Sequence, residues 1–209
     1  MSFVSDYIYF TEALVNNAAS DEEAAFLGSL MPEATRVLDV GCGYGRLARR
    51  LARKGYDVVG VEMNADMLAL ARTLDAHEET RASYLHADMR EVDIGTKADA
   101  AICWFTTFGV FEDAENQRVL ESVHRNLREG APFLIDVIDR DFILRTMQTW
   151  SVIELDDDFL IERHEFEPQL SRMHVKQTVI RNGVRRHEFS LRLYDAAGLR
   201  NALLQAGFR

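Results

Sequence analysis

The chain contains little cysteine, and this limits the kinds of protein it can be. Only Cys42 and Cys103 occur in 209 residues, each in or beside an apolar run of the kind that forms strands. Two thiols so far apart in sequence match neither a disulfide framework nor a paired-thiolate metal motif. A reducing cytoplasm fits this cysteine usage best.

A basic leader and long apolar runs are also missing. The segment from Met1 to Tyr9 carries Asp6 and no basic residue, so it lacks the pattern of a signal peptide. No apolar run approaches the roughly 20 residues that a membrane-spanning helix needs. We therefore expect a soluble, cytoplasmic protein with no membrane partner.

Positive charge is in the minority. The chain has 24 Lys and Arg against 34 Asp and Glu, a formal net charge of −10. Binding a nucleic-acid backbone needs clustered Lys and Arg, so nucleic acid is not expected as the partner. A basic cluster within 181–187 is interrupted by Asn182-Gly183, which favours surface charge beside a turn.

Motifs for metal binding and for serine hydrolysis are absent. The histidines and acids show no HExxH or CxxC spacing, so no metal cofactor is predicted. No Gly-x-Ser-x-Gly turn occurs either, and this argues against a serine hydrolase.

Helical and strand-like periodicities alternate through the first two thirds of the chain. This pattern is typical of an α/β fold, a doubly wound and mostly parallel sheet with helices on both faces. Strands are expected at 36–40, 57–61, 82–87, 98–104 and 132–138. Helices are expected at 21–30, 46–54, 64–74, 113–127 and 196–206.

The pattern changes to antiparallel strands between residues 150 and 194. The expected strands are 151–155, 159–166, 173–181 and 184–194, and Asn182-Gly183 is a strong hairpin signal. A lid over the ligand crevice and a packing or dimerisation surface both remain open. We expect one domain over 1–209, with its core at about 21–149 and 195–209 and this antiparallel insertion at about 150–194.

A glycine-rich turn follows the first expected strand and opens a helix. Gly41, Gly43 and Gly45 lack Cβ atoms, so the backbone can approach a ligand, and the helix N-terminus offers free N–H groups. In the dinucleotide-binding pattern the third glycine comes one position later. Asp39 adds a carboxylate that would repel a pyrophosphate and attract a ligand ammonium.

Acidic residues also end the next two expected strands. Glu62 could accept hydrogen bonds from ribose hydroxyls, and Asp88 could accept from an adenine amine while the Met89 N–H donates to the ring. Each acid alone could be an ordinary loop or capping residue. Together with Asp39 they fall on the one sheet edge where open α/β sheets bind ligands, which predicts a ligand site there.

Three segments carry a family resemblance: 37–46, 59–62 and 86–89 resemble, in order and spacing, the class I S-adenosylmethionine (SAM)-dependent methyltransferases. The similarity extends through 103–109, 127–130 and 136–141 to 199–208, which covers most of the chain. The resemblance implies SAM as cofactor and S-adenosylhomocysteine as product.

The resemblance also implies roles for individual residues. The glycine loop and Asp39 would contact the methionyl part, Glu62 the ribose, and Asp88 with Met89 the adenine, while Cys103 and Trp104 would lie near the sulfonium. The full expected set is Asp39, Gly41, Cys42, Gly43, Gly45, Arg46, Glu62, Met63, Asp88, Met89, Cys103 and Trp104.

The methyl acceptor is expected to be a small molecule. The subgroup with an antiparallel insertion resembles N- or O-methyltransferases, including those that act on glycine-like amines and amino sugars. Substrate-facing candidates are Tyr7, Tyr9, Phe108 and Arg140, together with His164, His174 and His187 of the insertion. The two tyrosines could instead pack as an aromatic helix, and the histidines could be surface residues; no catalytic base is predicted. A monomer and a homodimer both fit.

The sequence departs from the family pattern in places. Glu62 stands where Asp is common, and Asp139 where Asn is common, which leaves the cofactor assignment intact. The family also continues with two more strands after the segment that resembles 206–208. Without them the fifth strand would be an exposed apolar edge, so we expect a truncated form.

Two other functions compete with methyl transfer. A nicotinamide-dependent oxidoreductase would share the architecture, but the glycine spacing and Asp88-Met89 argue against it. A noncatalytic SAM-binding protein would keep the pocket and transfer nothing.

Overall fold

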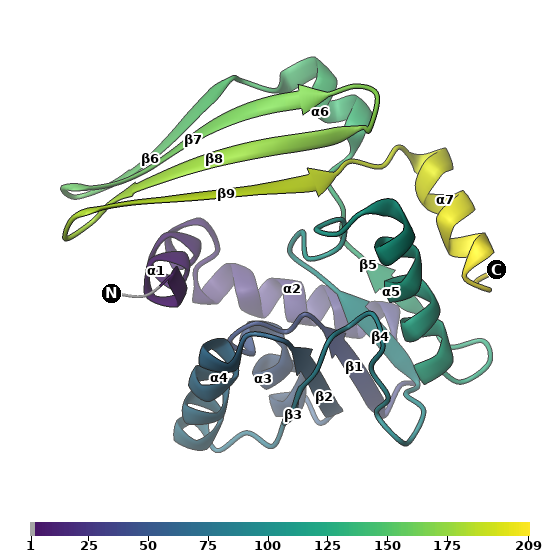
Figure 1. Ribbon diagram of the computed structural model, residues 1–209. Helices are drawn as coiled ribbons and strands as arrows, with labels where there is room; N and C mark the ends of the chain where they lie inside the picture. The colour runs from purple at the N-terminus through teal and green to yellow at the C-terminus, as the bar shows by residue number, and fades with distance from the viewer. Residues whose placement is uncertain (1–2) are drawn as a thin grey trace.

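A computed structural model describes residues 3–209, which form two β-sheets (Figure 1). The first is parallel, with strand order β3-β2-β1-β4-β5, and the second is antiparallel, with order β6-β7-β8-β9. The parallel strands are β1 (Arg36–Val40), β2 (Asp57–Glu62), β3 (Ser83–His86), β4 (Ala100–Cys103) and β5 (Phe133–Ile135). The antiparallel strands are β6 (Trp150–Leu155), β7 (Asp158–Glu167), β8 (Arg172–Ile180) and β9 (Val184–Arg192).

Helices cover both faces of the parallel sheet. Leu27 of α2 packs with Val37 of β1 on one face, which α3 also covers, and Val119 of α5 packs with Leu38 of β1 on the other. Helix α7 lies beside α5. The bounds are α1 (Phe3–Leu14), α2 (Asn17–Leu30), α3 (Arg46–Arg53), α4 (Ala65–Glu78), α5 (Asp113–Asn126), α6 (Arg140–Thr146) and α7 (Ala196–Gln205). The predicted doubly wound α/β fold is confirmed.

The helix expected at 64–74 continues to Glu78 as α4, and two further helices differ from expectation. Helix α2 begins at Asn17, not Asp21, because the Asn16 side chain accepts a hydrogen bond from the Ala19 N–H and so caps the helix earlier. Asp21 instead pairs with Arg50, at 2.8 Å. Helix α6 was not predicted; its start is capped by Asp139, whose side chain accepts from the Phe142 N–H.

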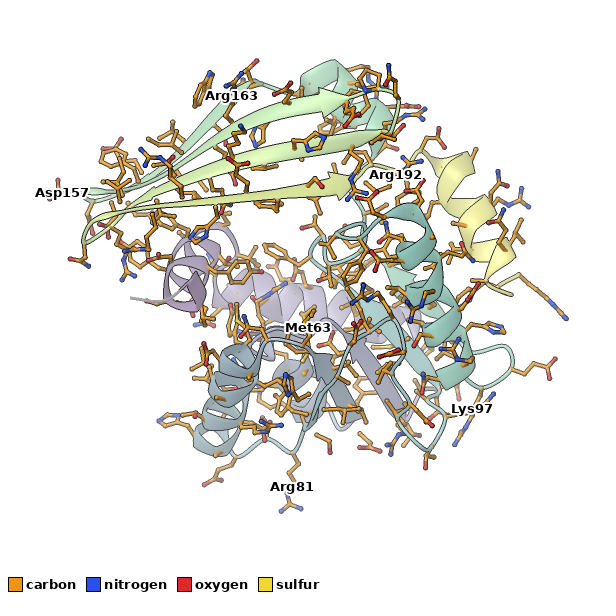
Figure 2. All side chains as sticks on the ribbon, in the orientation of Figure 1. Met63, Arg81, Lys97, Asp157, Arg163 and Arg192 are labelled. Carbon is orange, nitrogen blue, oxygen red and sulfur yellow. The ribbon has the colours of Figure 1, made fainter. Side chains whose placement is uncertain are left out.

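The antiparallel sheet has an inner and an outer face. Its hairpin turn at Asn182-Gly183 has φ angles of 50° and 115°, as a turn of that sequence requires. The inner face packs on α1, where Phe10 contacts Leu160 and Val179. The outer face points away from the parallel sheet, and Arg163 stacks there on the Trp150 ring (Figure 2).

Strand β5 lies at the edge of the parallel sheet and is shorter than predicted. Its side chains are half-buried, and Phe133 stacks on Phe208 with ring centroids 5.4 Å apart. Beyond Ile135, the Asp136 N–H donates to the Cys103 carbonyl of β4 at 2.9 Å, and the Asp136 carboxylate accepts from the Thr106 N–H in the loop after β4. No helix within 3–209 is long and apolar enough to cross a membrane.

Candidate functional site

The glycine loop joins β1 to α3 at the carboxyl edge of the parallel sheet. Gly41, Gly43 and Gly45 have φ angles of 70°, 55° and 72°, a region that residues with a Cβ rarely adopt. A Cβ on Gly41 would lie 2.2 Å from the Thr107 side chain, whereas one on Gly43 would project into open space. At Gly41 the loop therefore packs against the Thr107 side chain, whereas at Gly43 there is room beside the backbone for a ligand. No side chain caps the start of α3, so its first N–H groups are available to a ligand.

Asp39 is the last residue but one of β1, beside this loop, and is buried, with 3% of its surface exposed. Its Oδ2 atom has no hydrogen-bond partner within residues 3–209. Burial raises the pKa of the carboxyl from 3.8 to about 7, since Arg46 offsets only part of the desolvation and Glu62 adds repulsion. A buried carboxylate with an unused oxygen is suited to a cationic ligand group.

Glu62 ends β2 and braces the glycine loop. One carboxylate oxygen accepts from the Gly43 N–H at 3.2 Å, and the other accepts from the Asn64 N–H at 2.8 Å. Each oxygen keeps a further lone pair, so the carboxylate can still accept hydrogen bonds from a ligand. Loop geometry and ligand contact therefore depend on the same side chain.

Asp88 follows β3 and is engaged by a neighbour. Both of its carboxylate oxygens accept from the Arg90 guanidinium, at 2.6 to 3.0 Å, and Arg90 also pairs with Glu115. These hydrogen bonds hold the pKa of Asp88 below its ordinary value. The Arg90 guanidinium lies over the Phe111 ring, 4.3 Å from its centroid, which fixes its orientation.

A small cavity of about 50 Å³ lies between the glycine loop, the loop after β4 and helix α1. Tyr7 and Thr11 of α1 form one wall, and Trp104, Phe105 and Thr107 form another. The remaining lining residues are Asp39, Gly41, Cys42, Gly43, Tyr44, Arg46 and Leu47. Asp39 is thus part of a cavity wall.

The loop after β4 has an unusual backbone. Phe105 and Thr106 have φ angles of 62° and 55°, so two consecutive residues with side chains occupy the left-handed region. Asp136 accepts from the Thr106 N–H, and the Arg46 guanidinium lies 5.0 Å from the centre of the Phe105 ring. Such conformations persist only where the surroundings enforce them, and they concentrate at functional sites.

Arg46 connects the cavity to α2. Its side chain is buried, its Nη1 donates to Ser20 at 3.0 Å, and it pairs with Glu23 at 2.5 Å. With the Glu23 pair taking up part of its charge, Arg46 only partly offsets the desolvation of Asp39. The ionisation of Asp39 in the cavity wall therefore depends on the charge of the ligand that binds there.

The structure brings together part of the set expected from the sequence. Seven of the expected residues line the cavity: Tyr7, Asp39, Gly41, Cys42, Gly43, Arg46 and Trp104. The other expected cofactor residues lie outside its lining: Gly45, Glu62, Met63, Asp88, Met89 and Cys103. Met63 is exposed at the side of the parallel sheet that faces the antiparallel sheet (Figure 2). The cofactor roles of all these residues stay predictions.

Both cysteines are buried thiols. Burial raises the pKa of Cys42 and of Cys103, so neither is a thiolate at neutral pH. Cys103 is fully enclosed in β4, and Cys42 contributes to the cavity wall. The two thiols can therefore contribute to packing and to the shape of the cavity wall, but they are not suited to act as nucleophiles.

The substrate-facing candidates are dispersed. Tyr9 lies under the Arg181 guanidinium, 3.9 Å from the ring centroid, on the side of α1 that faces the antiparallel sheet. Phe108 is buried and stacks on Tyr194, and Arg140 pairs with Asp195 at 2.6 Å. Their roles toward a substrate stay predictions.

The three histidines of the insertion have different surroundings. His164 lies 3.4 Å from Glu162 and contacts the Gln148 carbonyl, both at the inner face. His174 pairs with Glu167 at 2.9 Å on the outer face. His187 lies opposite Gln177 in the β8–β9 register, on the inner face with His164.

Thr11, Tyr44, Leu47, Phe105 and Thr107 line the cavity without having been expected there. The glycine at position 41 could have indicated a close neighbour such as Thr107, because a side chain packed against the loop leaves no room for a Cβ there. Thr11 could not have been found in this way, because only the packing of α1 places it at the cavity.

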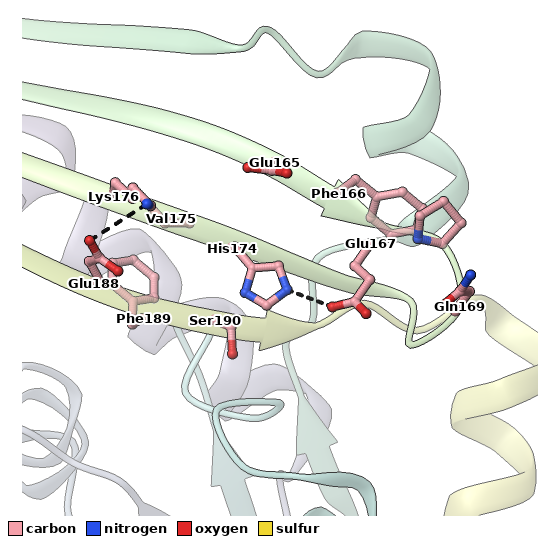
Figure 3. A pocket seen from close by; sticks show the side chains of 11 residues that line it. Glu165, Phe166, Glu167, Gln169, His174, Val175, Lys176, Glu188, Phe189 and Ser190 are labelled. Carbon is pink, nitrogen blue, oxygen red and sulfur yellow. Dashed lines mark hydrogen bonds and ion pairs between the residues drawn. The ribbon is translucent and has the colours of Figure 1, made fainter.

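A larger hollow of about 570 Å³ lies on the antiparallel sheet (Figure 3). Four of its lining groups form two pairs, His174 with Glu167 at 2.9 Å and Lys176 with Glu188 at 3.8 Å. It shares no lining residue with the cavity at the glycine loop. Within residues 3–209 no three His, Cys, Asp or Glu side chains gather as a metal site.

The parallel sheet, the glycine loop and the acids at successive strand ends define a Rossmann-like ligand-binding protein. Residues 37–130 match the family described as "Methyltransferase domain". A crystal structure of a SAM-dependent methyltransferase from Clostridium acetobutylicum ATCC 824 superposes with a TM-score of 0.83 at 16% identity, over 97% of this chain and 86% of that one. The fold is therefore that of the class I methyltransferases.

Two further proteins are similar to this chain. The dTDP-3-amino-3,6-dideoxy-alpha-D-glucopyranose N,N-dimethyltransferase of Streptomyces fradiae is 40% identical over 91 residues, 42% of this chain and 34% of that protein. The sugar N-methyltransferase KedS8 from Streptoalloteichus sp ATCC 53650 has a TM-score of 0.72 at 25% identity, over 96% of this chain and 83% of that one. The chain spans about half the length of the curated relatives it matches. The chain thus has the fold of class I, Rossmann-like methyltransferases and resembles them in sequence over residues 37–130, as the sequence predicted.

Proposed function

We propose that this protein transfers a methyl group from SAM to a nitrogen or oxygen atom of a small molecule. The observation that carries the proposal is Asp39, a buried carboxyl with an unused oxygen in the wall of the cavity at the glycine loop. A SAM molecule carries an ammonium group, for which this carboxylate is a fitting partner. A nicotinamide dinucleotide carries a pyrophosphate, which the same carboxylate would repel.

The remaining residues fit the rest of the cofactor. The open side of Gly43 and the uncapped start of α3 offer N–H groups to the methionyl carboxylate. Glu62 has free lone pairs for the ribose hydroxyls, and Asp88 with Met89 is assigned to the adenine. In that role Asp88 would accept from the adenine amine beside its existing bonds to Arg90.

The bound cofactor supplies an activated methyl group, so the protein mainly has to position the acceptor and exclude water. Trp104, Phe105 and Tyr7 surround the cavity with aromatic rings that exclude water from the transfer. Asp39 and Glu62 favour the cationic cofactor over its neutral product, which promotes exchange after transfer. The reaction proposed here uses no metal and no covalent enzyme intermediate.

For the acceptor we propose an amine in the first instance. The names of the Streptomyces fradiae and Streptoalloteichus relatives specify N-methylation of sugars, and oxygen acceptors remain the alternative. We also propose that 1–209 acts as one domain with the insertion at about 150–194, in the cytoplasm, which its free buried cysteines support.

Calorimetric titration tests the cofactor assignment. Wild-type protein should bind SAM and S-adenosylhomocysteine with micromolar dissociation constants and should not bind NAD. Asp39→Asn and Glu62→Gln should each weaken SAM binding at least about tenfold, while the exposed Glu22→Gln should leave it unchanged. Binding of NAD without SAM would contradict the proposal.

A screen of acceptors with radiolabelled SAM then separates an enzyme from a noncatalytic binder. Amino sugars, glycine-like amines and their hydroxyl counterparts form the panel. Methylated product identifies the enzyme. Tight SAM binding with no product from the whole panel would favour the noncatalytic alternative.

A further inference from the structure

Helix α1 packs against the glycine-loop cavity on one face and against the antiparallel sheet on the other. Tyr7 and Thr11 line the cavity at the glycine loop, while Val4 and Ile8 pack beside them on Tyr44 and Met67. The opposite face of the helix carries Asp6, Tyr9 and Phe10 toward the antiparallel sheet. Figure 1 shows α1 between the hairpin end of that sheet and α4.

Asp6 is buried, with 2% of its surface exposed, and α1 itself contains no basic residue. Its charge is balanced by the β8–β9 hairpin. Arg185 donates to both carboxylate oxygens, Nε at 2.5 Å and Nη2 at 2.9 Å, and Arg181 approaches to 3.6 Å. A bidentate pair of this kind has a defined geometry, and removing one partner leaves a buried charge uncompensated.

The arginines are held in place from the sheet side. Arg185 donates to the Arg181 carbonyl at 2.7 Å. Arg181 in turn pairs with Asp158 at 3.2 Å and stacks on the Tyr9 ring. The hairpin therefore presents a preformed basic site, and Asp6 of α1 fits into it.

The cavity that α1 closes can hold only part of a nucleoside cofactor, and Glu62 and Asp88 lie outside its lining. Its volume is about 50 Å³, against several hundred Å³ for typical small-molecule sites. The other walls are loops of the parallel sheet, braced by Glu62 and Asp136. Helix α1 is the wall that is attached from outside the parallel sheet, so its position governs the size of the site.

We propose that Asp6 and Arg185 are positioning residues for the cofactor. Their ion pair holds α1 against the glycine loop so that Tyr7 and Thr11 close the site, and the antiparallel sheet thereby controls how long the cofactor stays bound. This inference rests on the proposed function.

Three variants and one matched control test the pair. Arg185→Gln, Asp6→Asn and the double variant each remove it. Arg186→Gln removes a neighbouring arginine that is exposed on the opposite face of β9. Two quantities are measured on the full chain: amide hydrogen exchange of α1 without ligand, and the SAM dissociation rate, followed by stopped-flow tryptophan fluorescence, to which Trp104 in the cavity wall contributes.

Both single variants should speed exchange within residues 4–14 and raise the SAM dissociation rate at least about tenfold, with protection of β8 unchanged. The double variant should be no worse than the more affected single variant, since the two residues act as a unit. Arg186→Gln should behave as wild type. Arg185→Lys keeps the positive charge but loses the bidentate hydrogen bonds to Asp6, so its α1 exchange and SAM dissociation rates should lie between those of wild type and Arg185→Gln.

Several results would overturn the proposal. Unchanged α1 exchange and unchanged SAM dissociation in both single variants would exclude any positioning role. Faster α1 exchange with an unchanged dissociation rate would show a purely structural pair. Should wild-type protein fail to bind SAM, the proposed function fails and this inference with it, whereas a defect limited to the variants affects this inference alone.

Discussion

At the scale of single residues, Asp39 is the side chain on which the proposed binding of SAM and its pH dependence rest. Burial raises its pKa to about 7, whereas holding a cation requires the ionised form. Sequence placed this acid at a strand end, and the structure adds that one of its oxygens has no partner among the described residues. Its protonation state therefore couples ligand binding to pH.

SAM affinity should depend on pH through Asp39. Below about pH 7 the carboxyl is protonated in the free protein, and binding must first remove that proton. Each unit of pH below about 7 should then weaken binding by up to about tenfold, and binding should be tightest at about pH 7 to 8, because the α-amino group of the ligand itself loses its proton near pH 8. Calorimetry from pH 5.5 to 8.5 measures this dependence. Asp39→Asn should bind weakly at every pH; a wild-type profile that is flat would contradict the prediction.

The same carboxyl should lower the stability of the free protein. Its pKa is about 7 folded and 3.8 as an ordinary group, so its stabilising contribution is fully present below 3.8 and is lost as the pH rises through 7. At pH 8 the wild type carries the full cost of a buried charge. Asp39→Asn should therefore raise the melting temperature by several degrees at pH 8, and by less at pH 5.

Calorimetric melting at both pH values measures this effect, with the exposed Glu22→Gln as control. A variant that is less stable than wild type at pH 8 would mean that Asp39 holds a structural partner. Loss of binding together with gain of stability is the pattern expected of a binding-site residue.

At the scale of elements, the glycine loop has two positions that differ in a testable way. Gly41 faces Thr107 with no room for a Cβ, while Gly43 faces open space, although both have positive φ. Gly43→Ala should cost about 1 to 2 kcal/mol in free energy of unfolding from backbone strain alone, and Gly41→Ala clearly more.

Urea unfolding of the two variants measures the difference. Gly95→Ala is the matched control, since Gly95 has a φ of 73° and open space but lies away from the cavity. Gly43→Ala should also weaken SAM binding, which Gly95→Ala should not. Equal stability of Gly41→Ala and Gly43→Ala would show that the loop shifts to accept the added atom.

The positions of helices and strands could be predicted where the hydrophobic periodicity and the turn or capping residues indicate the same boundaries. The glycine loop, β1, β2, the turn at Asn182-Gly183 and most helix ends follow from local signals. Helix α6 and the early start of α2 did not, because Asn16 and Asp139 compete with other polar residues for the capping role. The contact of Asp136 with the loop after β4 joins two segments far apart in sequence, which no local pattern encodes.

At the scale of the whole molecule, ligand binding should stabilise the chain. SAM at a hundredfold excess over its dissociation constant should raise the free energy of unfolding by about 2.7 kcal/mol, and NAD should not change it. Chemical unfolding with each ligand measures this, with Asp39→Asn as a control that should lose the gain. Stabilisation by NAD alone would favour the oxidoreductase.

The sequence by itself determined the α/β class, the order of the strands along the chain, the glycine loop and the acids at the carboxyl ends of β1, β2 and β3. These features are local: periodicity, turn chemistry and the rule that carboxyl ends of parallel strands meet at one edge. Tertiary structure alone decided which of them share a cavity. Tyr7 and Thr11 lie at the glycine loop on helix α1, whose Asp6 pairs with Arg185, 179 positions away in the chain. Contacts across that separation depend on how helix α1 packs against the antiparallel sheet, and no spacing within the sequence records it.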